Sequence, residues 1–259
     1  PIIMSVKLPG FIPRELRQLA RFVPLRGWDV IDWKPLLGSL REVSWRYVSG
    51  NGIAALRRET SRQCPSIAFA RSLRGADPLW SSEQAASRRR YGDDILRLYF
   101  AQWLVDDGLF IDLRSSRFGI IDDQLTFAPS GLWIRLRPEF REGMVALYRS
   151  FYADNDAAFE DALRQMGMIK PGLSAAAEAE LKQLLFDHFG IDQREQQFSI
   201  DAFKASFDEL FEFFIEHDYK LHSDFVWVGF YLITLYLTLE EGGAAHDTRS
   251  LCAEELLDA

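Results

Sequence analysis

The sequence predicts a mainly α-helical fold with one small β-hairpin near residues 118–128. From residue 138 onwards, apolar residues recur every three or four positions, which is the period of an amphipathic helix. Two short apolar stretches flank Asp122 and Asp123, and aspartates of this kind favour the tight turn of a hairpin. Apolar residues make up 48% of the chain, with 20 Phe and 7 Trp, which is typical of a packed globular protein rather than a disordered one.

Five helices are expected in the C-terminal part of the chain. The first begins at Pro138, because proline is favoured at the first helical position. Asn155 is expected to cap the second helix and Gly167 to end it. The other three are expected over residues 174–189, over the aromatic stripe at 203–214, and over the apolar stretch at 224–240.

The middle of the chain predicts one further helix and several extended segments. A helix is expected from residue 91, with Gly108 at its C-terminal end. Extended segments are expected at 109–113, 118–121 and 125–128. Apolar spacing over residues 12–25 predicts a short amphipathic helix, packed on the core or lying on a membrane surface.

Composition and charge divide the chain into three parts. Residues 1–90 contain 16 Lys and Arg against 7 Asp and Glu, whereas residues 91–259 contain 14 against 31. Residues 75–90 predict a boundary loop, and residues 242–259 predict a polar tail. The expected organisation is a basic N-terminal region (1–90), a helical region (91–241) and the tail. Such a charge split indicates two parts with different partners or two parts that dock on each other, and a basic surface without a partner is the alternative.

Several classes of site and location are disfavoured by the sequence. Cys64 and Cys252 lack metal-ligand spacing, and so few cysteines favour a reducing, cytoplasmic setting. The first ten residues lack a secretory signal pattern. The stretch at 225–239 spans about 15 residues, short of the roughly 20 that a membrane-spanning helix needs. The acidic C-terminal part contains no recognisable nucleic-acid-binding module, so no nucleic-acid partner is expected.

A group of His and Asp residues precedes the last predicted helix. His217, Asp218, His222 and Asp224 are residue types that bind metals. The favoured interpretation is capping and turn chemistry, with Ser223 or Asp224 as the helix N-cap.

Three segments resemble the UbiB/AarF family of atypical kinases. They are LYFAQWLVDDGLF at 98–110, LTFAPSGLWIRL at 125–136, and the segment 137–169, which contains NDAAFEDALRQMG at 155–167 near its end. The resemblance runs from about residue 95 to residue 239 and rests on the order of these segments. It implies a kinase-like C-terminal lobe with a remodelled N-terminal third. It also implies a setting near ubiquinone biosynthesis or other lipid metabolism.

The residues that this family uses for phosphoryl transfer are altered here. In the family, a His-Ala-Asp-Pro-His-Pro-Gly-Asn loop supplies the catalytic Asp and a metal-binding Asn, but this chain reads FIDLRSSRFG at 110–119. Asp112 stands at the position of the catalytic Asp, Arg117 falls near that of the metal-binding Asn, and Pro129 replaces the Asp of Asp-Phe-Gly. Magnesium needs hard oxygen ligands, and phosphoryl transfer depends on metal ions that bridge the phosphates. No metal site and no cofactor are therefore expected, and the family's nucleotide-binding motifs are also missing from residues 1–90.

Three functional hypotheses follow. The first is a pseudokinase, a non-catalytic accessory or scaffold protein, cytoplasmic or peripheral on the inner face of the membrane. Its basic N-terminal third would contact an anionic membrane surface or an acidic protein. The second is a divergent ATPase or kinase that uses Asp112 as the base, with Asp122 or Asp123 recruited to hold Mg²⁺ and ATP. The third is a carrier that holds a lipid or quinone between the Phe-rich helices at 203–214 and 225–239.

Overall fold

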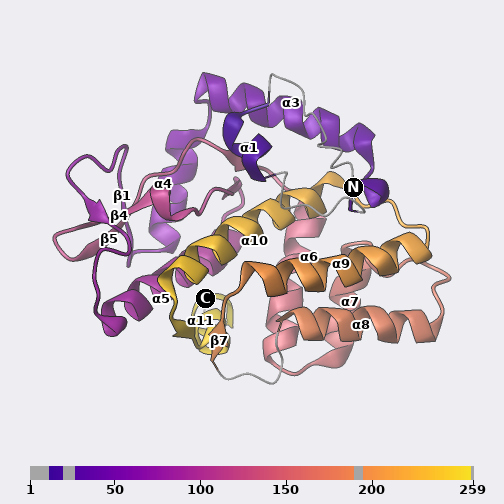
Figure 1. The fold of residues 1–259 in the computed structure, drawn as a ribbon. Helices are drawn as coiled ribbons and strands as arrows, with labels where there is room; N and C mark the ends of the chain where they lie inside the picture. The colour runs from indigo at the N-terminus through magenta and orange to yellow at the C-terminus, as the bar shows by residue number, and fades with distance from the viewer. Residues whose placement is uncertain (1–11, 20–26, 190–194, 258–259) are drawn as a thin grey trace, which may run out of the picture.

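The computed structural model describes residues 12–19, 27–189 and 195–257, and it is mainly helical with small sheets (Figure 1), as the sequence predicts. The helices of the N-terminal part are α1 (Arg14–Leu19), α2 (Gly27–Val30), α3 (Trp33–Ser49) and α4 (Ile53–Gln63). They are followed by α5 (Ala85–Ala101), α6 (Pro138–Tyr152), α7 (Asp156–Gln165), α8 (Ala175–Phe189), α9 (Ile200–Glu216), α10 (Ser223–Gly242) and α11 (Thr248–Cys252).

The strands are short, and the largest sheet lies at one end of the molecule (Figure 1). The largest sheet has the order β1 (Ala68–Phe69), β5 (Gln124–Phe127), β4 (Phe118–Ile121) and β2 (Asp77–Pro78). Within it, β1 runs parallel to β5, and the other neighbours are antiparallel. Separate pairs are formed by β3 (Leu109–Phe110) with β6 (Trp133–Ile134), and by β7 (Gln196–Gln197) with β8 (Ala245–His246).

The predicted β-hairpin is confirmed. Asp122 and Asp123 form the two-residue turn between β4 and β5, with φ angles of 51° and 60°. Two consecutive positive φ values match the twist of a hairpin, and Asp tolerates this conformation better than most residues. The extended segment expected at 109–113 is a strand only at Leu109–Phe110.

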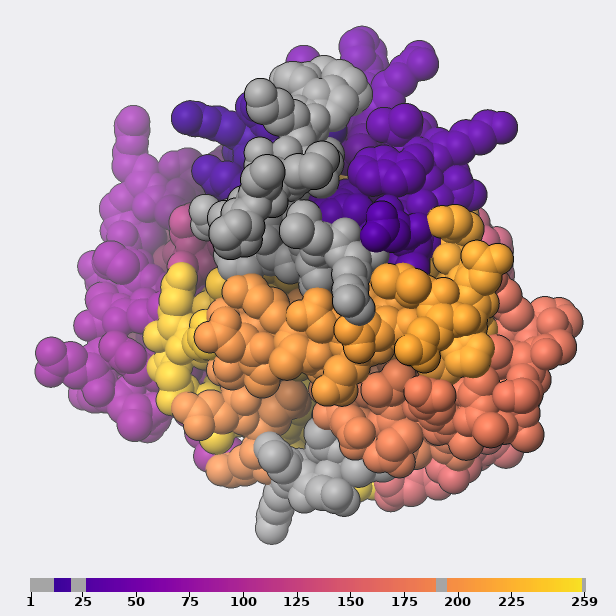
Figure 2. Space-filling view, turned by 45° about the vertical axis from the view of Figure 1, so that its right-hand side comes forward, coloured from indigo at the N-terminus to yellow at the C-terminus, as the bar shows by residue number. Residues whose placement is uncertain are grey.

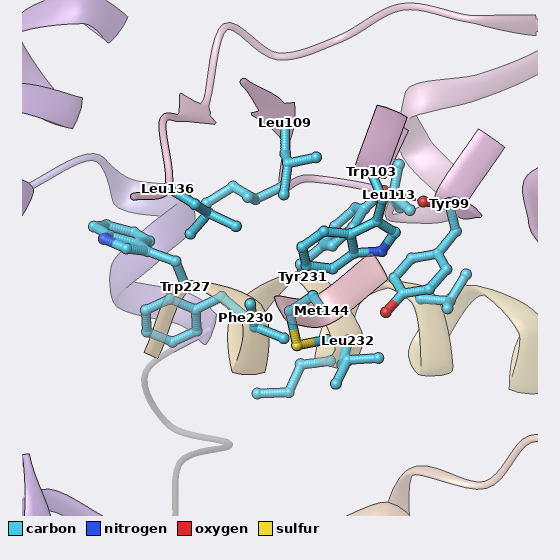
Figure 3. Close-up of a cluster of buried hydrophobic side chains, with 14 of the residues drawn as sticks. Tyr99, Trp103, Leu109, Leu113, Leu136, Met144, Trp227, Phe230, Tyr231 and Leu232 are labelled. Atoms are coloured by element: carbon cyan, nitrogen blue, oxygen red, sulfur yellow. Dashed lines mark hydrogen bonds between the residues drawn. The ribbon is translucent and has the colours of Figure 1, made fainter. Parts of the chain in front are cut away.

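Helix α10 lies at the centre of the core. It packs against α3, α5 and α9, and it is buried nearly all round, as expected for a helix that is apolar on every face. Tyr99 of α5 and Tyr231 of α10 stack with their ring centroids 4.7 Å apart, and Trp103 lies 6.0 Å from Tyr231 (Figure 3). Among the described residues, no helix combines the length and the apolar character needed to cross a bilayer.

The residues that cap α7 are those predicted from the sequence, whereas the N-cap of α10 differs from the prediction. Asn155 caps α7 by accepting a hydrogen bond from the backbone N–H of Ala158 at 3.2 Å, and Gly167 follows the helix with a φ of 76°. At α10 the cap is His222, whose Nδ1 accepts from the backbone N–H of Asp224 at 3.3 Å. The expectation of Ser223 or Asp224 as the cap is wrong, because the Asp224 carboxylate instead accepts from Arg137 Nε at 2.6 Å.

Two boundaries near α5 also differ from expectation. The helix begins at Ala85, inside the predicted loop, so the run from Arg88 to Arg90 lies on its first turns. The boundary expected between residues 90 and 91 falls inside α5, and strands from both sides of it share one sheet. The helix passes through a 3₁₀ turn at Gln102–Leu104, so Gly108 does not end it. Gly108 instead precedes β3, where Ile134 O lies only 2.4 Å from the position of an added Cβ.

The described part of the expected polar tail is folded onto the core. After α10 come β8, α11 and a final helical turn at Ala253–Leu257. Leu251, Cys252 and Leu256 are buried, and this segment packs against α5 and α6. The prediction failed because these few apolar residues stand among charged ones, so their burial depends on the surface that α5 and α6 provide. In the region 12–25, a helix is present at Arg14–Leu19, and residues 20–25 lie outside the described ranges.

Candidate functional site

The loop at 111–117, which follows β3, is fixed by its backbone. Thr234 of α10 donates a hydrogen bond to Ile111 O at 2.9 Å and accepts one from Leu113 N at 3.1 Å. Thr238, one turn further along α10, donates to Leu113 O at 2.7 Å. These two threonines satisfy buried backbone groups inside an otherwise apolar helix, and they set the orientation of the residue between Ile111 and Leu113.

That residue is Asp112, which is 1% exposed and holds two arginines. Arg114 binds it in a bidentate manner, with Nε 2.7 Å from Oδ1 and Nη2 2.8 Å from Oδ2. Arg117 Nε donates to Oδ2 at 2.8 Å. Burial by itself would raise the pKa of Asp112, but the hydrogen bonds and charges of Arg114 and Arg117 outweigh it and hold this pKa below its usual value.

Helix α1 and helix α3 complete the surroundings of this carboxylate. Gln18 accepts a hydrogen bond from Arg114 Nη1 at 3.2 Å, and Glu15 lies 3.9 Å from Arg117 Nη2. Tyr47 of α3 donates to Glu15 Oε1 at 3.1 Å, and burial, followed by the charge of Glu15, raises the pKa of Tyr47. We call these six residues the Asp112 cluster: Glu15, Gln18, Tyr47, Asp112, Arg114 and Arg117. Two carboxylates face two guanidiniums, so the cluster is balanced in charge.

The structure brings together the three positions that the sequence singled out. Ala128 N donates to Arg117 O at 2.8 Å, which places Pro129 beside the loop that carries Asp112 and Arg117. These residues do not fit a magnesium site. Both Asp112 oxygens are occupied by guanidiniums, Arg117 places its positive charge beside this carboxylate, and Pro129 offers no side-chain oxygen.

Asp122 and Asp123 are not part of this cluster. They lie at the far end of the β4–β5 hairpin, and a four-residue strand rises by about 13 Å, which separates them from Arg117. Asp123 accepts from Arg90 at 2.8 Å and from Tyr91 at 2.9 Å instead. Across the described ranges, no group of three or more His, Cys, Asp and Glu side chains is arranged to hold a metal ion, and this includes the His and Asp residues before α10.

A second candidate site is an apolar cavity of about 100 Å³ between α6, α8, α9 and α10. Its walls come largely from the aromatic stripes that suggested a carrier, including Phe207, Phe211 and Phe225. His188 of α8 also lines it, and burial lowers the pKa of His188 to about 4, so the ring is neutral at pH 7. Figure 2 shows α9, in orange, at the surface next to α8, in salmon.

The tautomer of His188 follows from its neighbour. Ser206 Oγ lies 2.7 Å from His188 Nδ1 and donates its single proton to Phe203 O at 2.9 Å. Both contacts are satisfied when Nδ1 of His188 carries the proton and Nε2 is the acceptor. The cavity is therefore lined mostly by apolar groups, and the neutral imidazole of His188 and the side chain of Lys204 also contribute to its wall.

Sequence reasoning found Asp112, Arg117 and Pro129 but missed Arg114 and the contribution of α1. Arg114 could have been found, because residues two apart in an extended segment face the same side. Glu15 and Gln18 gave no local signal, since they approach Asp112 only through the tertiary fold. No protein-family model matches the chain, and no curated protein sequence matches it. The resemblance to the UbiB/AarF family therefore stays a prediction.

Proposed function

We propose that this protein is a pseudokinase-type accessory or scaffold protein, related to the UbiB/AarF family and without phosphoryl-transfer activity. One observation carries the proposal: the Asp112 carboxylate has both oxygens bound by Arg114 and Arg117 and is buried beside α1. The setting in isoprenoid-quinone or lipid metabolism is what the resemblance implies, and it is part of the proposal.

The chemistry of the Asp112 cluster supports this proposal. A catalytic base must have a free oxygen within reach of the proton that it removes. The lowered pKa makes Asp112 a weaker base, and its oxygens already accept three hydrogen bonds from guanidinium nitrogens. Arg114 and Arg117 are neutralised within the cluster, so they are not available to balance nucleotide phosphates without breaking it.

The first prediction concerns ATP. A ligand that binds only the folded state raises the melting temperature. The proposal implies that ATP does not bind, so millimolar ATP, with or without Mg²⁺, is expected to leave the melting temperature unchanged. Differential scanning fluorimetry measures this shift, and a coupled assay measures phosphate release. The double variant Asp122→Asn/Asp123→Asn is the matched control, and it is expected to behave as the wild type in both assays. A shift that grows with Mg²⁺, together with hydrolysis that Asp112→Asn abolishes, would support the divergent ATPase instead.

The cavity supports a second candidate function, a carrier of an apolar ligand. Its lining comes from the helices that prompted this hypothesis, and His188 Nε2 can accept a hydrogen bond from a ligand hydroxyl. At about 100 Å³ it is smaller than the roughly 150 Å³ cavity that holds benzene in an engineered protein. It would therefore hold only a short stretch of hydrocarbon, with the rest of a lipid or quinone outside.

The second prediction tests this carrier role. Gly229 lines the cavity, and an added Cβ would meet no atom within 4 Å. Gly229→Leu is expected to fill part of the cavity and to remove any ligand that copurifies with the wild type, while Gly229→Ala retains it. Organic extraction followed by mass spectrometry provides the measurement. A wild-type protein that yields no organic ligand would rule out the carrier and leave the pseudokinase proposal untouched.

A further inference from the structure

Exposed apolar side chains are concentrated on helix α3. Seven large hydrophobic residues of the described chain are exposed, and four of them lie on this one helix. Val48 is 81% exposed and Trp45 is 67% exposed, which are the highest values of the group. The four are Trp33, Leu37, Trp45 and Val48. Isolated exposed hydrophobic residues are ordinary, but a cluster on a single element marks a surface that something else covers.

The exposed residues form a stripe along α3, interleaved with basic residues. At 3.6 residues per turn, five outward-facing residues fall within an arc of about 80°. We call them the α3 stripe: Lys34, Leu37, Arg41, Trp45 and Val48. No carboxylate lies within this arc. Glu42 lies about 60° beyond the arc and is paired with Arg46 on the same helix.

The opposite face of α3 anchors the helix to the protein. Leu36, Leu40 and Val43 are buried, and α3 packs against α10 and β6. Trp33 stacks on Trp28 with ring centroids 5.4 Å apart, so its exposure is partly explained within the chain, and it is left out of the stripe. Figure 1 shows α3 along the outer edge of the molecule, on the side away from α7 and α8. The helix is thus fixed by one face and presents the stripe on the other.

We propose that the α3 stripe docks this protein on an anionic lipid surface. The stripe runs from Lys34 to Val48, and 14 steps of 1.5 Å give it a length of about 21 Å, which lets the helix lie flat in the membrane interface. Tryptophan is enriched at that interface, where its apolar ring and its N–H meet the two environments they prefer. Lys34 and Arg41 supply the charge that anionic headgroups attract, each basic residue near such a surface contributing about 1 kcal/mol.

Charge favours a lipid surface over a second copy of the chain. The stripe is purely basic within its arc, and residues 1–90 carry nine more basic than acidic groups. Two copies facing each other through this stripe would bring cations together, which disfavours a symmetric dimer. The docking is independent of the Asp112 cluster and of the cavity, so it can fail or succeed separately from the proposed function.

The test is flotation of the full chain with lipid vesicles. Wild-type protein is expected to float with phosphatidylcholine vesicles that contain phosphatidylglycerol, and less with phosphatidylcholine alone. Binding is expected to weaken as salt is added, because headgroup charge is screened. The variant Leu37→Gln/Trp45→Gln/Val48→Gln should lose at least about tenfold in vesicle affinity through lost apolar insertion. Lys34→Glu/Arg41→Glu should lose the preference for anionic vesicles.

Ile215→Gln is the matched control, since Ile215 is 40% exposed on α9 and lies outside the stripe. It is expected to bind as the wild type does. All substituted residues are exposed, so melting curves should overlay and exclude misfolding as the cause of lost binding. The proposal is overturned if the wild type does not float with anionic vesicles, or if the triple variant floats equally well. A dimer that forms with concentration and disappears in the triple variant would identify the stripe as a protein interface and also overturn it.

Discussion

Replacing Asp112 with alanine is expected to lower the free energy of unfolding by about 3–5 kcal/mol, the usual cost of removing one partner from a buried ion pair. The substitution leaves Arg114 and Arg117 beside each other without the carboxylate that now separates their charges. Asp112→Asn keeps the shape and removes the charge, so it is expected to cost less than alanine. Equilibrium unfolding in urea gives these differences directly.

The same substitution changes how stability depends on pH. The folded-state pKa of Asp112 is lowered, so its carboxylate binds protons less readily in the folded protein than in the unfolded chain. Its contribution is fully present above the unfolded pKa of about 3.9 and is lost as the pH falls through the lower folded value. Wild-type protein should therefore lose stability below about pH 4, and this part of the loss should be absent in Asp112→Asn.

A control separates a buried charge from a surface one. Asp123 also binds an arginine, but its side chain is 75% exposed. Asp123→Asn removes this charge and keeps a residue that accepts the positive φ of the turn, so it is expected to change stability little. A double-mutant cycle between Asp112 and Arg117 should show strong coupling, because the two groups are in direct contact. If Asp112→Asn has wild-type stability but abolishes an ATPase activity, Asp112 is a catalytic residue and the proposed function is wrong.

The elements that were predicted correctly carry their signals locally. The β4–β5 turn needs two residues that accept positive φ, and the chain places two aspartates there. Asn155 and Gly167 bound α7 through contacts within three residues of the helix ends. The N-cap of α10 was missed because two competing groups settle it: Asp224 binds Arg137 from another segment, and His222 takes the cap.

The candidate site was only partly predictable, because some of its residues come from segments that are far apart in the sequence. Asp112 stood out because it stands at the position of the family's catalytic Asp, and Arg117 and Pro129 stood out as departures from the family pattern. The groups that contact the Asp112 carboxylate could not be inferred from that pattern. Arg114 binds Asp112 through local chain geometry, but Glu15 and Gln18 come from α1, about a hundred residues earlier. Contacts of such sequence separation leave no periodic signal.

Alanine substitutions at two helical glycines are expected to change stability in opposite directions. In a helix interior, Gly to Ala ordinarily stabilises by about 0.5–1 kcal/mol, because alanine restricts the unfolded chain. Gly229 lies inside α10, and an added Cβ there meets nothing within 4 Å, so Gly229→Ala should show this gain. Gly92 lies inside α5, where an added Cβ would fall 2.2 Å from His246 Cε1.

His246 cannot easily move away from that contact. Its ring is 1% exposed, its Nδ1 lies 2.7 Å from Asp93 Oδ1, and Phe198 packs near it with ring centroids 6.1 Å apart. Overpacking of this kind costs about 1–3 kcal/mol, which exceeds the helix-propensity gain, so Gly92→Ala should be destabilised. Urea unfolding of Gly229→Ala and Gly92→Ala measures both changes in stability, and the two variants carry the same substitution in the same protein.

A third variant locates the cause of the loss at Gly92. In the background His246→Ala the ring is absent, so adding Gly92→Ala should no longer cost stability and should recover the ordinary gain. The result also bears on the C-terminal segment. His246 belongs to the stretch that the sequence alone predicts to be a polar tail, and a tail free in solvent would place no ring against α5. Unchanged stability in Gly92→Ala alone would mean that this segment is not docked, whereas the predicted coupling requires that it is.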